Sequence, residues 1–501
     1  MPQIGSSASV VWHPWSSVPF AEAHASGRPI LLLITVRWSP AGHQWSSLVE
    51  SSPGLVDALR RTVVCVAVDA DERPDIAERY GAGGWPTIAF LAASGAVLDA
   101  TTWLAPDELG RVLDELARVY IDRGNELSTV APIVGAVEPV EPFTAAARSL
   151  DLDDRQLLVQ ACLDLVWESA DEGVGGFGRA PKFPHVWPLR LLLAASDPEP
   201  AGRPTRAFAR RTLDVMAFGA LWDSGRGGFW RRCATRDWHE PGEAKLLDVN
   251  VAMIDLLLDG AAAFADERLR SRAADTARFV ATSLQHPDGG FVAATWREGD
   301  AWLIDPTSYA DQNARAAKAL LRASRLLGDL ELARCATRSI ERLAPALYRR
   351  SAGMAHYLRE QPGGRGLLGD QVWSAAALID AFAATDDLAY RDLADELMRS
   401  AWVKYWTPDW GWHDRLVSLA GAGDVGLLAM PLVPFVTACE AAQVFDRLAR
   451  LTDDLEHAER ADAVLRSLVP HYAAQGVDAA AFALALVHTA PASMAPHADV
   501  E

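Results

Sequence analysis

A glycine–aromatic turn recurs along the C-terminal part of the chain, and it limits the fold more than any other feature. It reads Gly-Gly-Phe at residues 175–177, 227–229 and 289–291, Trp-Gly-Trp at 410–412, and has a weaker copy near Gly353. These turns lie about 50–60 residues apart, which is the length of two helices with their loops. We therefore expect twelve helices in six hairpins from residue 151 onward, with no strand among them.

The last expected helix decides between an open and a closed arrangement of these hairpins. It contains the sequence AAAFALALV at residues 479–487. An open array of repeats needs polar faces on its terminal units, and this segment is too apolar to provide one. We predict that the hairpins close into an (α/α)6 toroid, so that the first and last helices cover each other.

The N-terminal region follows a different pattern. Apolar runs of strand length at 29–36 and 63–68 alternate with helical segments, and an amphipathic helix is expected at 106–120. Such alternation favours a small α/β domain. We place this domain at residues 1–125, a proline-bearing linker at 126–150, and the toroid at 151–501.

Four aspartates open the second helix of successive hairpins: Asp248, Asp311, Asp370 and Asp424. An aspartate at a helix start is commonly an N-cap that binds unpaired backbone N–H groups. Equivalent positions in a toroid would also ring one end of the central cavity, where crowded carboxylates acquire the separated pKa values that acid/base chemistry needs. Asp311 and Asp370, which both begin an Asp-Gln pair, are our catalytic candidates, and Asp248 and Asp424 are substrate-binding candidates.

A histidine and several tryptophans extend this candidate site. His239 lies in a polar loop and would serve as an acid or base near neutral pH, unless it is only a hydrogen-bonded loop residue. Indole rings stack on sugar rings, although most tryptophans pack in cores. Among the 18 tryptophans, Trp238, Trp373 and Trp412 are the substrate-binding candidates.

Composition excludes several classes of partner and site. The formal net charge is −19, which disfavours nucleic acid and anionic membrane surfaces as partners. No apolar run is long enough to span a membrane, and the first 27 residues contain no Lys or Arg. The five cysteines are scattered without metal-ligand spacing. We expect a cytoplasmic protein without a metal or other cofactor.

Several motifs in the chain resemble those of one known family. They are Val-Trp-His-Pro-Trp at 11–15, Gly-Gly-Trp-Pro-Thr at 83–87, Gly-Gly-Phe-Gly at 175–178 and Ala-Pro-Lys-Phe-Pro at 180–184. In these segments the chain is similar to the thioredoxin-like proteins of the DUF255 type, which include the spermatogenesis-associated protein 20 group. The resemblance implies a thioredoxin-like domain joined to a six-hairpin barrel like those of N-acylglucosamine 2-epimerases and six-hairpin glycosidases. Lys182, within the last motif, joins the substrate-binding candidates.

The resemblance fails at the position where this family carries a redox motif, Cys-His-Trp-Cys-His. The chain has Ser39, Pro40, Ala41, Gly42 and His43 there. Dithiol exchange needs a nucleophilic and a resolving thiol, so this loop cannot perform it. The resemblance also implies a cis peptide bond before Pro86, next to this altered loop.

Two functions remain open at this stage. In the first, the toroid binds or processes a small sugar or sugar conjugate by epimerase- or glycosidase-like chemistry. In the second, the chain is a non-catalytic binding or scaffold protein, a degenerate family member, whose thioredoxin-like domain could contact a protein partner. The sequence does not decide whether the chain is an enzyme. A deep cavity with two nearby carboxylates would favour the first.

Overall fold

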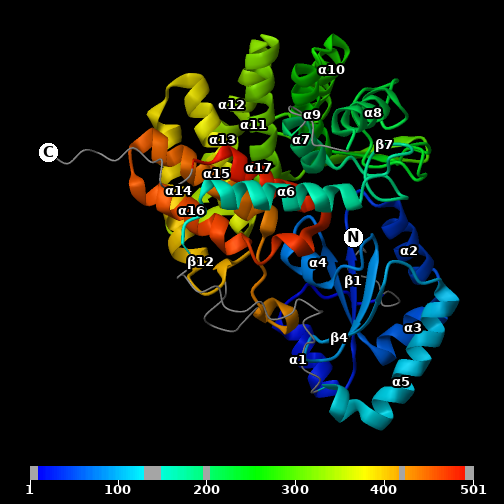
Figure 1. Cartoon of the computed structure of the whole chain (residues 1–501). Coiled ribbons are helices and arrows are strands. Elements are labelled where there is room, and N and C mark those ends of the chain that lie inside the picture. Colours follow the sequence, from blue (N-terminus) through cyan, green and yellow to red (C-terminus); the bar gives the residue numbers. More distant parts are fainter. Residues whose placement is uncertain (1–9, 129–147, 196–202, 417–423, 491–501) are drawn as a thin grey trace. The chain divides into compact units, whose positions relative to one another are not determined.

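The computed structural model describes residues 10–128, 148–195, 203–416 and 424–490 (Figure 1). The chain divides into two compact units. The first comprises Met1–Pro139 with Arg415–Leu432, and the second comprises Val140–Asp414 with Val433–Glu501. Most of the linker expected at residues 126–150 lies outside the described residues.

The first unit is built on a four-stranded sheet, shown in blue in Figure 1. The strand order is β2-β1-β3-β4, with β1 parallel to β2 and antiparallel to β3. Leu31, Leu33, Trp45, Leu59 and Phe90 form part of its buried core. The strands are β1 (Ile30–Thr35), β2 (Val64–Asp69), β3 (Thr87–Leu91) and β4 (Val97–Thr101). The helices are α1 (Ser17–Ser26), α2 (Pro40–Glu50), α3 (Pro53–Thr62), α4 (Pro74–Tyr80) and α5 (Pro106–Ser128).

A distant piece of chain completes this unit. The short helix η1 (Gly426–Ala429) packs against α4. The Tyr80 hydroxyl accepts a hydrogen bond from the backbone N–H of Leu427 at 2.8 Å and donates one to the Gly95 carbonyl at 3.0 Å. Arg415 also forms an ion pair with Asp75 at 3.3 Å. These contacts join residues more than 300 positions apart in the sequence.

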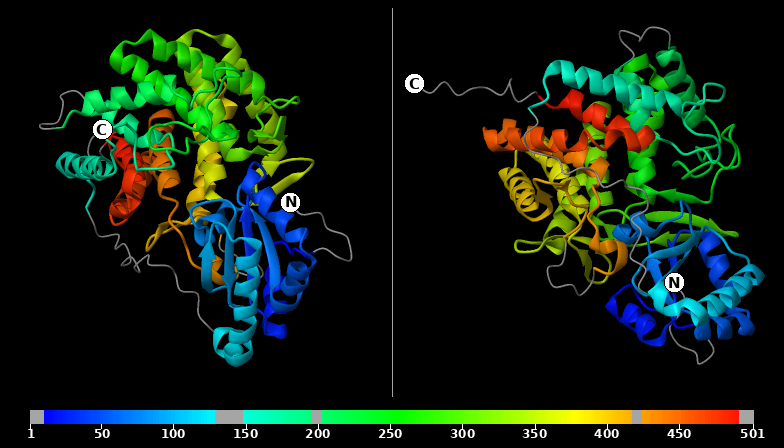
Figure 2. Two further views of the ribbon diagram at one scale, coloured as in Figure 1. Left: turned by 90° about the vertical axis from the view of Figure 1, so that its right-hand side faces the viewer. Right: turned by 60° about the horizontal axis from the view of Figure 1, so that its bottom comes forward.

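The second unit is the predicted (α/α)6 toroid, with twelve α-helices in its described residues. Six inner helices contact one another in a closed ring: α7 (Val186–Ala194), α9 (Leu247–Phe264), α11 (Ala310–Leu327), α13 (Leu368–Thr385), α15 (Phe435–Thr452) and α17 (Ala479–His488). The other six pack around them: α6 (Leu152–Glu168), α8 (Thr205–Phe218), α10 (Glu267–Ser283), α12 (Leu330–Leu347), α14 (Leu388–Tyr405) and α16 (Leu455–Leu468). The red α17 packs on α7 and on the cyan α6, which closes the ring (Figure 2).

The prediction that this unit contains no strand is wrong. Short strands form in the loops: β5 (Ala244–Leu246), β6 (Ala294–Glu298), β7 (Ala301–Asp305), β8 (Ser308–Tyr309), β9 (Tyr348–Arg349), β10 (Gly353–Leu358), β11 (Pro362–Arg365), β12 (Trp406–Thr407) and β13 (Gly411–Trp412). They pair as small sheets, one with the order β5-β6-β7 and another with the order β11-β10-β8. The turns bring extended segments side by side, so their backbone groups pair in ladders too short for sequence periodicity to reveal.

Side-chain amides on the inner helices hold the recurring turns in place. Asn250 accepts a hydrogen bond from the Phe229 N–H at 2.7 Å and donates to its carbonyl at 3.1 Å. Asn313 makes the same pair of bonds with Phe291. Gln371 does so with Met354, beyond Gly353. The weaker copy of the turn is therefore held in the same way as the others.

Candidate functional site

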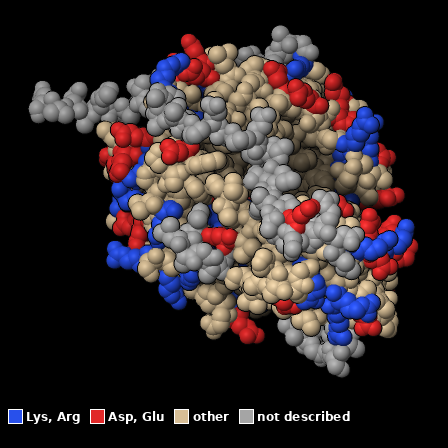
Figure 3. Space-filling view, turned by 90° about the horizontal axis from the view of Figure 1, so that it is seen from below, with Lys and Arg blue, Asp and Glu red and all other residues tan. Residues whose placement is uncertain are grey.

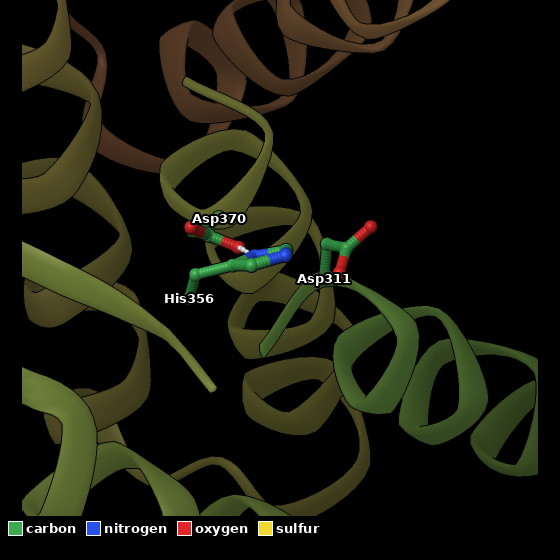
Figure 4. Close-up of side chains that lie close together, drawn as sticks. All are labelled: Asp311, His356 and Asp370. Atoms are coloured by element: carbon green, nitrogen blue, oxygen red, sulfur yellow. Dashed lines mark hydrogen bonds and ion pairs between the residues drawn. The ribbon is translucent and has the colours of Figure 1, made fainter. Parts of the chain in front are cut away.

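Asp311 and Asp370 meet at one point of the toroid, with His356 between them (Figure 4). One nitrogen or oxygen of each side chain lies within 4.8 Å of the others. The Nδ1 atom of His356 is hydrogen-bonded to Oδ1 of Asp370 at 2.9 Å. His356 is 5% exposed and Asp370 1% exposed, whereas Asp311 is partly exposed. The structure thus unites the two predicted catalytic aspartates and adds a histidine that the sequence did not indicate.

Each member of this cluster comes from a different element. Asp311 lies in the first turn of α11, Asp370 in the first turn of α13, and His356 on β10 between those helices. Gly353 starts β10 at φ 73°, and a Cβ atom there would lie 2.5 Å from the Gln371 side chain. Glycine is therefore required at the point where the strand approaches α13, and this approach brings His356 to Asp370.

The N-cap interpretation of the inner aspartates is wrong. The N-cap residues of α9, α11 and α13 are Leu246, Tyr309 and Leu367, and none forms a side-chain cap. The capping aspartates instead precede the outer helices α10, α12, α14 and α16, at Asp266, Asp329, Asp387 and Asp454. Asp248, Asp311 and Asp370 are therefore not N-cap residues, although Asp248 accepts a hydrogen bond from the Val249 N–H in the first turn of α9 at 2.6 Å.

Burial shapes the electrostatics of the cluster. Burial raises the pKa of Asp370, with the charge of Asp311 adding to the rise and His356 opposing it. Oδ2 of Asp370 and Oδ1 of Asp311 are buried, and neither has a hydrogen-bond partner among the described residues. A buried oxygen without a partner is costly in a purely structural role, so the arrangement favours contact with a ligand.

A cavity of about 640 Å³ lies inside the toroid, and Asp311, His356 and Asp370 are not among the described residues that line it. Arg315 and Trp373 line it, one helical turn beyond Asp311 and Asp370 respectively. Asp248 lines it as well, and burial raises its pKa while the nearby charge of Arg315 opposes the rise. The volume suits a small molecule. Asp248 and Trp373 thus lie at the cavity as the sequence analysis proposed.

The other proposed acid or base, His239, lies elsewhere. It is in an exposed loop, where its Nδ1 contacts the carbonyl oxygen of Asp237 at 3.1 Å and its carboxylate at 3.2 Å. It neither lines the cavity nor belongs to the cluster. Asp424 belongs to the first unit, where it pairs with Arg415 at 2.6 Å, and it is not among the residues that line the cavity.

The remaining substrate-binding candidates are packed into the structure. Lys182 is fully buried and its Nζ donates to Asp171 at 3.0 Å and to the Gly178 carbonyl at 2.7 Å. Trp238 is 2% exposed and lies against Gly176, where a Cβ atom would come within 2.4 Å of its ring. Trp412 packs with the rings of Trp402, Trp406 and Phe445. None of the three lines the cavity.

The altered redox loop has an ordinary structural role. Ser39 is the N-cap of α2, where its side chain accepts a hydrogen bond from the Gly42 N–H at 3.1 Å. Pro40 and Ala41 begin the helix and His43 is partly buried within it. The Trp85–Pro86 peptide bond is cis, as expected. Burial raises the pKa of Cys65 in this unit to about 12, which disfavours the reactive thiolate.

The cluster also has the composition of a metal site. Two carboxylates and an imidazole suit a divalent cation, and within the described residues no other group of His, Cys, Asp and Glu side chains comes together in this way. The hydrogen bond between His356 and Asp370, however, already engages one donor atom of each residue. The absence of a metal therefore stays a prediction, which the experiments below address.

Comparison with known proteins confirms the resemblance inferred from the motifs. Residues 4–134 match the family model described as "Protein of unknown function, DUF255". The uncharacterized protein B0495.5 of Caenorhabditis elegans is 27% identical over 349 residues, covering 64% of this chain and 46% of the relative. Human spermatogenesis-associated protein 20 is 28% identical over 307 residues, covering 57% of this chain and 38% of the relative. The matched regions thus span less than half the length of these relatives.

Solved structures similar to this chain share the toroid. A sugar epimerase from a ruminal bacterium has a TM-score of 0.54 at 12% identity, covering 64% of this chain and 86% of its own. Cellobiose 2-epimerase from Bacillus thermoamylovorans B4167 has a TM-score of 0.53 at 11% identity, covering 62% of this chain and 85% of its own. D-mannose isomerase has a TM-score of 0.52 at 11% identity, covering 64% of this chain and 87% of its own. At these identities the likeness establishes the fold alone.

Two findings bear on possible partners. On the face shown in Figure 3, the described Lys and Arg side chains alternate with Asp and Glu and form no continuous basic surface. In the part of the chain that is described, no helix combines the length and the apolar character that crossing a membrane requires.

Proposed function

We propose that the second unit binds a small sugar and transfers a proton at a carbon next to its carbonyl group, as an epimerase or isomerase does. One observation carries the proposal. The His356 imidazole is hydrogen-bonded to the buried Asp370 at 2.9 Å and lies beside Asp311, and the helices of the two aspartates also supply Arg315 and Trp373 to the lining of a cavity of about 640 Å³. A histidine oriented by a buried carboxylate is a general base suited to neutral pH.

The proposed reaction follows from these groups. His356 removes the proton from the carbon beside the carbonyl, and the electron pair of the broken C–H bond moves to the carbonyl oxygen as an enediolate forms. Asp370 holds the imidazole in place and stabilises its charged form. A proton then returns to the same carbon from the opposite face, or to the neighbouring carbon, with Asp311 as the second group that exchanges protons. The reaction needs no oxidant or reductant.

This chemistry fits the cluster better than glycoside hydrolysis does. Glycosidases generally place two carboxyl groups on either side of the bond they cleave. Here an imidazole lies between the two carboxylates, and one of these binds the imidazole directly. Structural relatives whose names describe sugar epimerisation and isomerisation support the proposal through their fold.

Exchange of carbon-bound hydrogen with solvent tests the proposal directly. The full chain would be incubated in D₂O with a panel of aldoses, ketoses and N-acetylhexosamines, and loss of the proton next to the carbonyl would be followed by NMR. We expect exchange with the wild type, and a loss of at least about 100-fold in His356→Gln because a general base typically contributes 10²–10⁴-fold. His24→Gln, which makes the same change at an exposed histidine, is the matched control and should catalyse the hydrogen exchange like the wild type.

Three results would contradict the proposal. The first is no exchange above the uncatalysed rate for any sugar, which would favour a non-catalytic binding protein. The second is exchange that survives in His356→Gln but is lost in His239→Gln, which would place the base in the exposed loop. The third is exchange abolished by EDTA and restored by a divalent cation, which would make the cluster a metal centre. A protein partner for the first unit stays a separate prediction.

A further inference from the structure

The cavity in the toroid carries the opposite charge balance from the chain as a whole. Its lining contains six Lys or Arg residues against four Asp or Glu residues, although the chain has a formal net charge of −19. Cationic walls in a cavity of low dielectric attract anions and repel cations. The cavity is therefore the place in this acidic protein where an anionic small molecule would be favoured.

The tryptophans in the cavity are covered by cations. The guanidinium of Arg315 lies 4.2 Å from the ring centre of Trp373, and Nζ of Lys318 lies 5.5 Å from it. Arg190 similarly lies 5.7 Å from the ring centre of Trp187. These distances are typical of cation–π contacts. A sugar bound in the cavity would therefore contact the cationic groups that cover these rings as well as the indole rings themselves.

Most of these cations are held by carboxylates on other inner helices. Lys318 pairs with Glu440, and Arg447 pairs with Asp380. Arg322 pairs with Asp255 at 2.8 Å, and Arg190 pairs with Asp259 at 2.6 Å. These pairs cross from helix to helix, so they stabilise the wall and leave little of their charge for a ligand.

Arg315 is the exception among the cations that face Trp373. Its closest carboxylate is Asp311 on its own helix, 3.8 Å away, which is too long for a hydrogen bond. Its Nε atom is buried without a hydrogen-bond partner among the described residues. Asp248 also feels the charge of Arg315, but burial raises the pKa of Asp248, which weakens it as a competing anion. A guanidinium placed in this way suits a carboxylate or phosphate group.

We infer that the cavity takes an anionic sugar, one that bears a carboxylate or a phosphate, and that Arg315 binds the anionic group over Trp373. The inference rests on the proposed function for the sugar itself, because Arg315 lies one helical turn beyond Asp311 on α11. It adds the chemical class of the substrate, which neither the fold nor the cluster defines.

Calorimetric titration of the full chain with four probes tests this inference. Glucuronate provides a sugar carboxylate, glucose 6-phosphate a sugar phosphate, glucose the neutral ring, and inorganic phosphate the anion without a sugar. We expect one of the two anionic sugars to bind at least about tenfold more tightly than glucose, because hydrogen bonds to charged groups typically contribute that much or more. The stronger of the two identifies the anionic group.

Variants then locate the site of recognition. Arg315→Gln should remove the preference, so that the anionic sugar binds about as weakly as glucose. Arg315→Lys provides a second variant if Arg315→Gln does not fold, and it should weaken the preference because an ammonium keeps the charge but lacks the planar donors of the guanidinium. Arg334→Gln makes the same change on an exposed surface and should bind like the wild type, since Arg334 is exposed and pairs with the exposed Glu331. Circular dichroism of each variant would confirm an intact helical fold.

Several results would overturn the inference: binding of none of the probes, equal affinity for glucose and the anionic sugars, or a preference that survives in both cavity variants. Inorganic phosphate binding as tightly as glucose 6-phosphate would show recognition of the anion alone, which also contradicts it. The proposed function fails separately. Tight binding of an anionic sugar without hydrogen exchange would contradict only the catalysis, and exchange on neutral sugars without an anionic preference would contradict only this inference.

Discussion

The toroid holds two kinds of buried aspartate with a buried basic partner, and they differ in how fully their charges are satisfied. Next to the glycine–aromatic turn at residues 175–177, Asp171 binds Lys182 and also accepts two hydrogen bonds from Arg236, at 2.7 and 2.8 Å. At the candidate site, Asp370 binds His356 and keeps one buried oxygen without a partner among the described residues. Hydrogen bonds from Arg236 and Lys182 lower the pKa of Asp171, whereas burial raises that of Asp370.

This difference separates a structural ion pair from a reactive one. Lys245 repeats the first arrangement at the next glycine–aromatic turn. Its Nζ donates hydrogen bonds to Asp223 and, at 2.6 Å, to the Gly227 carbonyl. A fully bonded pair fixes a loop and has no capacity left for a ligand. An incompletely bonded carboxylate beside a histidine retains acceptor capacity and a shifted pKa, which are common at functional sites. The following predictions test this distinction, beginning with the largest effect.

Breaking the structural pair should have the largest effect on stability. Asp171→Asn leaves the fully buried ammonium of Lys182 without its counter-charge. Removing one partner of a buried pair typically costs about 3–5 kcal/mol. Urea unfolding followed by tryptophan fluorescence would measure the loss. The double variant Asp171→Leu/Lys182→Met should recover much of it, and a single-variant loss below about 1 kcal/mol would show that the pair is not structural.

Removing an amide that holds a turn should have an intermediate effect. Asn313→Ala leaves the buried N–H and carbonyl of Phe291 without the bonds that Asn313 provides. An unsatisfied buried polar group costs about 1–3 kcal/mol, so we expect a loss of about 2–3 kcal/mol in the same unfolding experiment. Ser339→Ala is the control, because it removes only a bond of 3.3 Å to Asn313 and should cost less. Equal losses in the two variants would contradict the role given to the amide.

Asp370 and Asp171 should make the free energy of unfolding depend on pH with opposite signs. The pKa of Asp370 is raised in the folded state, so its contribution to stability is present at low pH and is lost as the pH rises through the folded pKa. The pKa of Asp171 is lowered, so its contribution is present at neutral pH and is lost as the pH falls below the ordinary value of about 4.

Unfolding free energies measured between about pH 2 and pH 8 would reveal this contrast, because the Asp171 contribution changes only below about pH 4. The free energy of unfolding of Asp370→Asn should increase relative to that of the wild type as the pH rises. Asparagine does not titrate, whereas the wild type loses stability as Asp370 ionises. The penalty of Asp171→Asn should shrink as the pH falls. If both differences change in the same direction with pH, the two carboxylates do not differ as proposed.

The sequence predicted part of the candidate site and missed its central residue. Asp311 and Asp370 stand at equivalent positions of a repeat and both begin an Asp-Gln pair, so local pattern singled them out. His356 stands three residues after the weak turn at Gly353, in a strand of six residues, and no spacing links it to Asp370. Lys182 and Trp238 belong to recognisable motifs, yet their burial shows that these motifs stabilise loops.

The sequence by itself determined the two-part organisation, the six hairpins, their recurring turns and the loss of dithiol chemistry. Those features depend on local patterns, such as helical periodicity, glycines at the turns and the presence of thiols. Each pattern lies within one segment of the chain and needs no partner segment. Only the tertiary structure decided which polar side chains meet. Strand β10 must lie against α13 before His356 reaches Asp370, and α11 must pack beside α13 before Arg315 covers Trp373. Such contacts form between separate elements, so their geometry follows from packing.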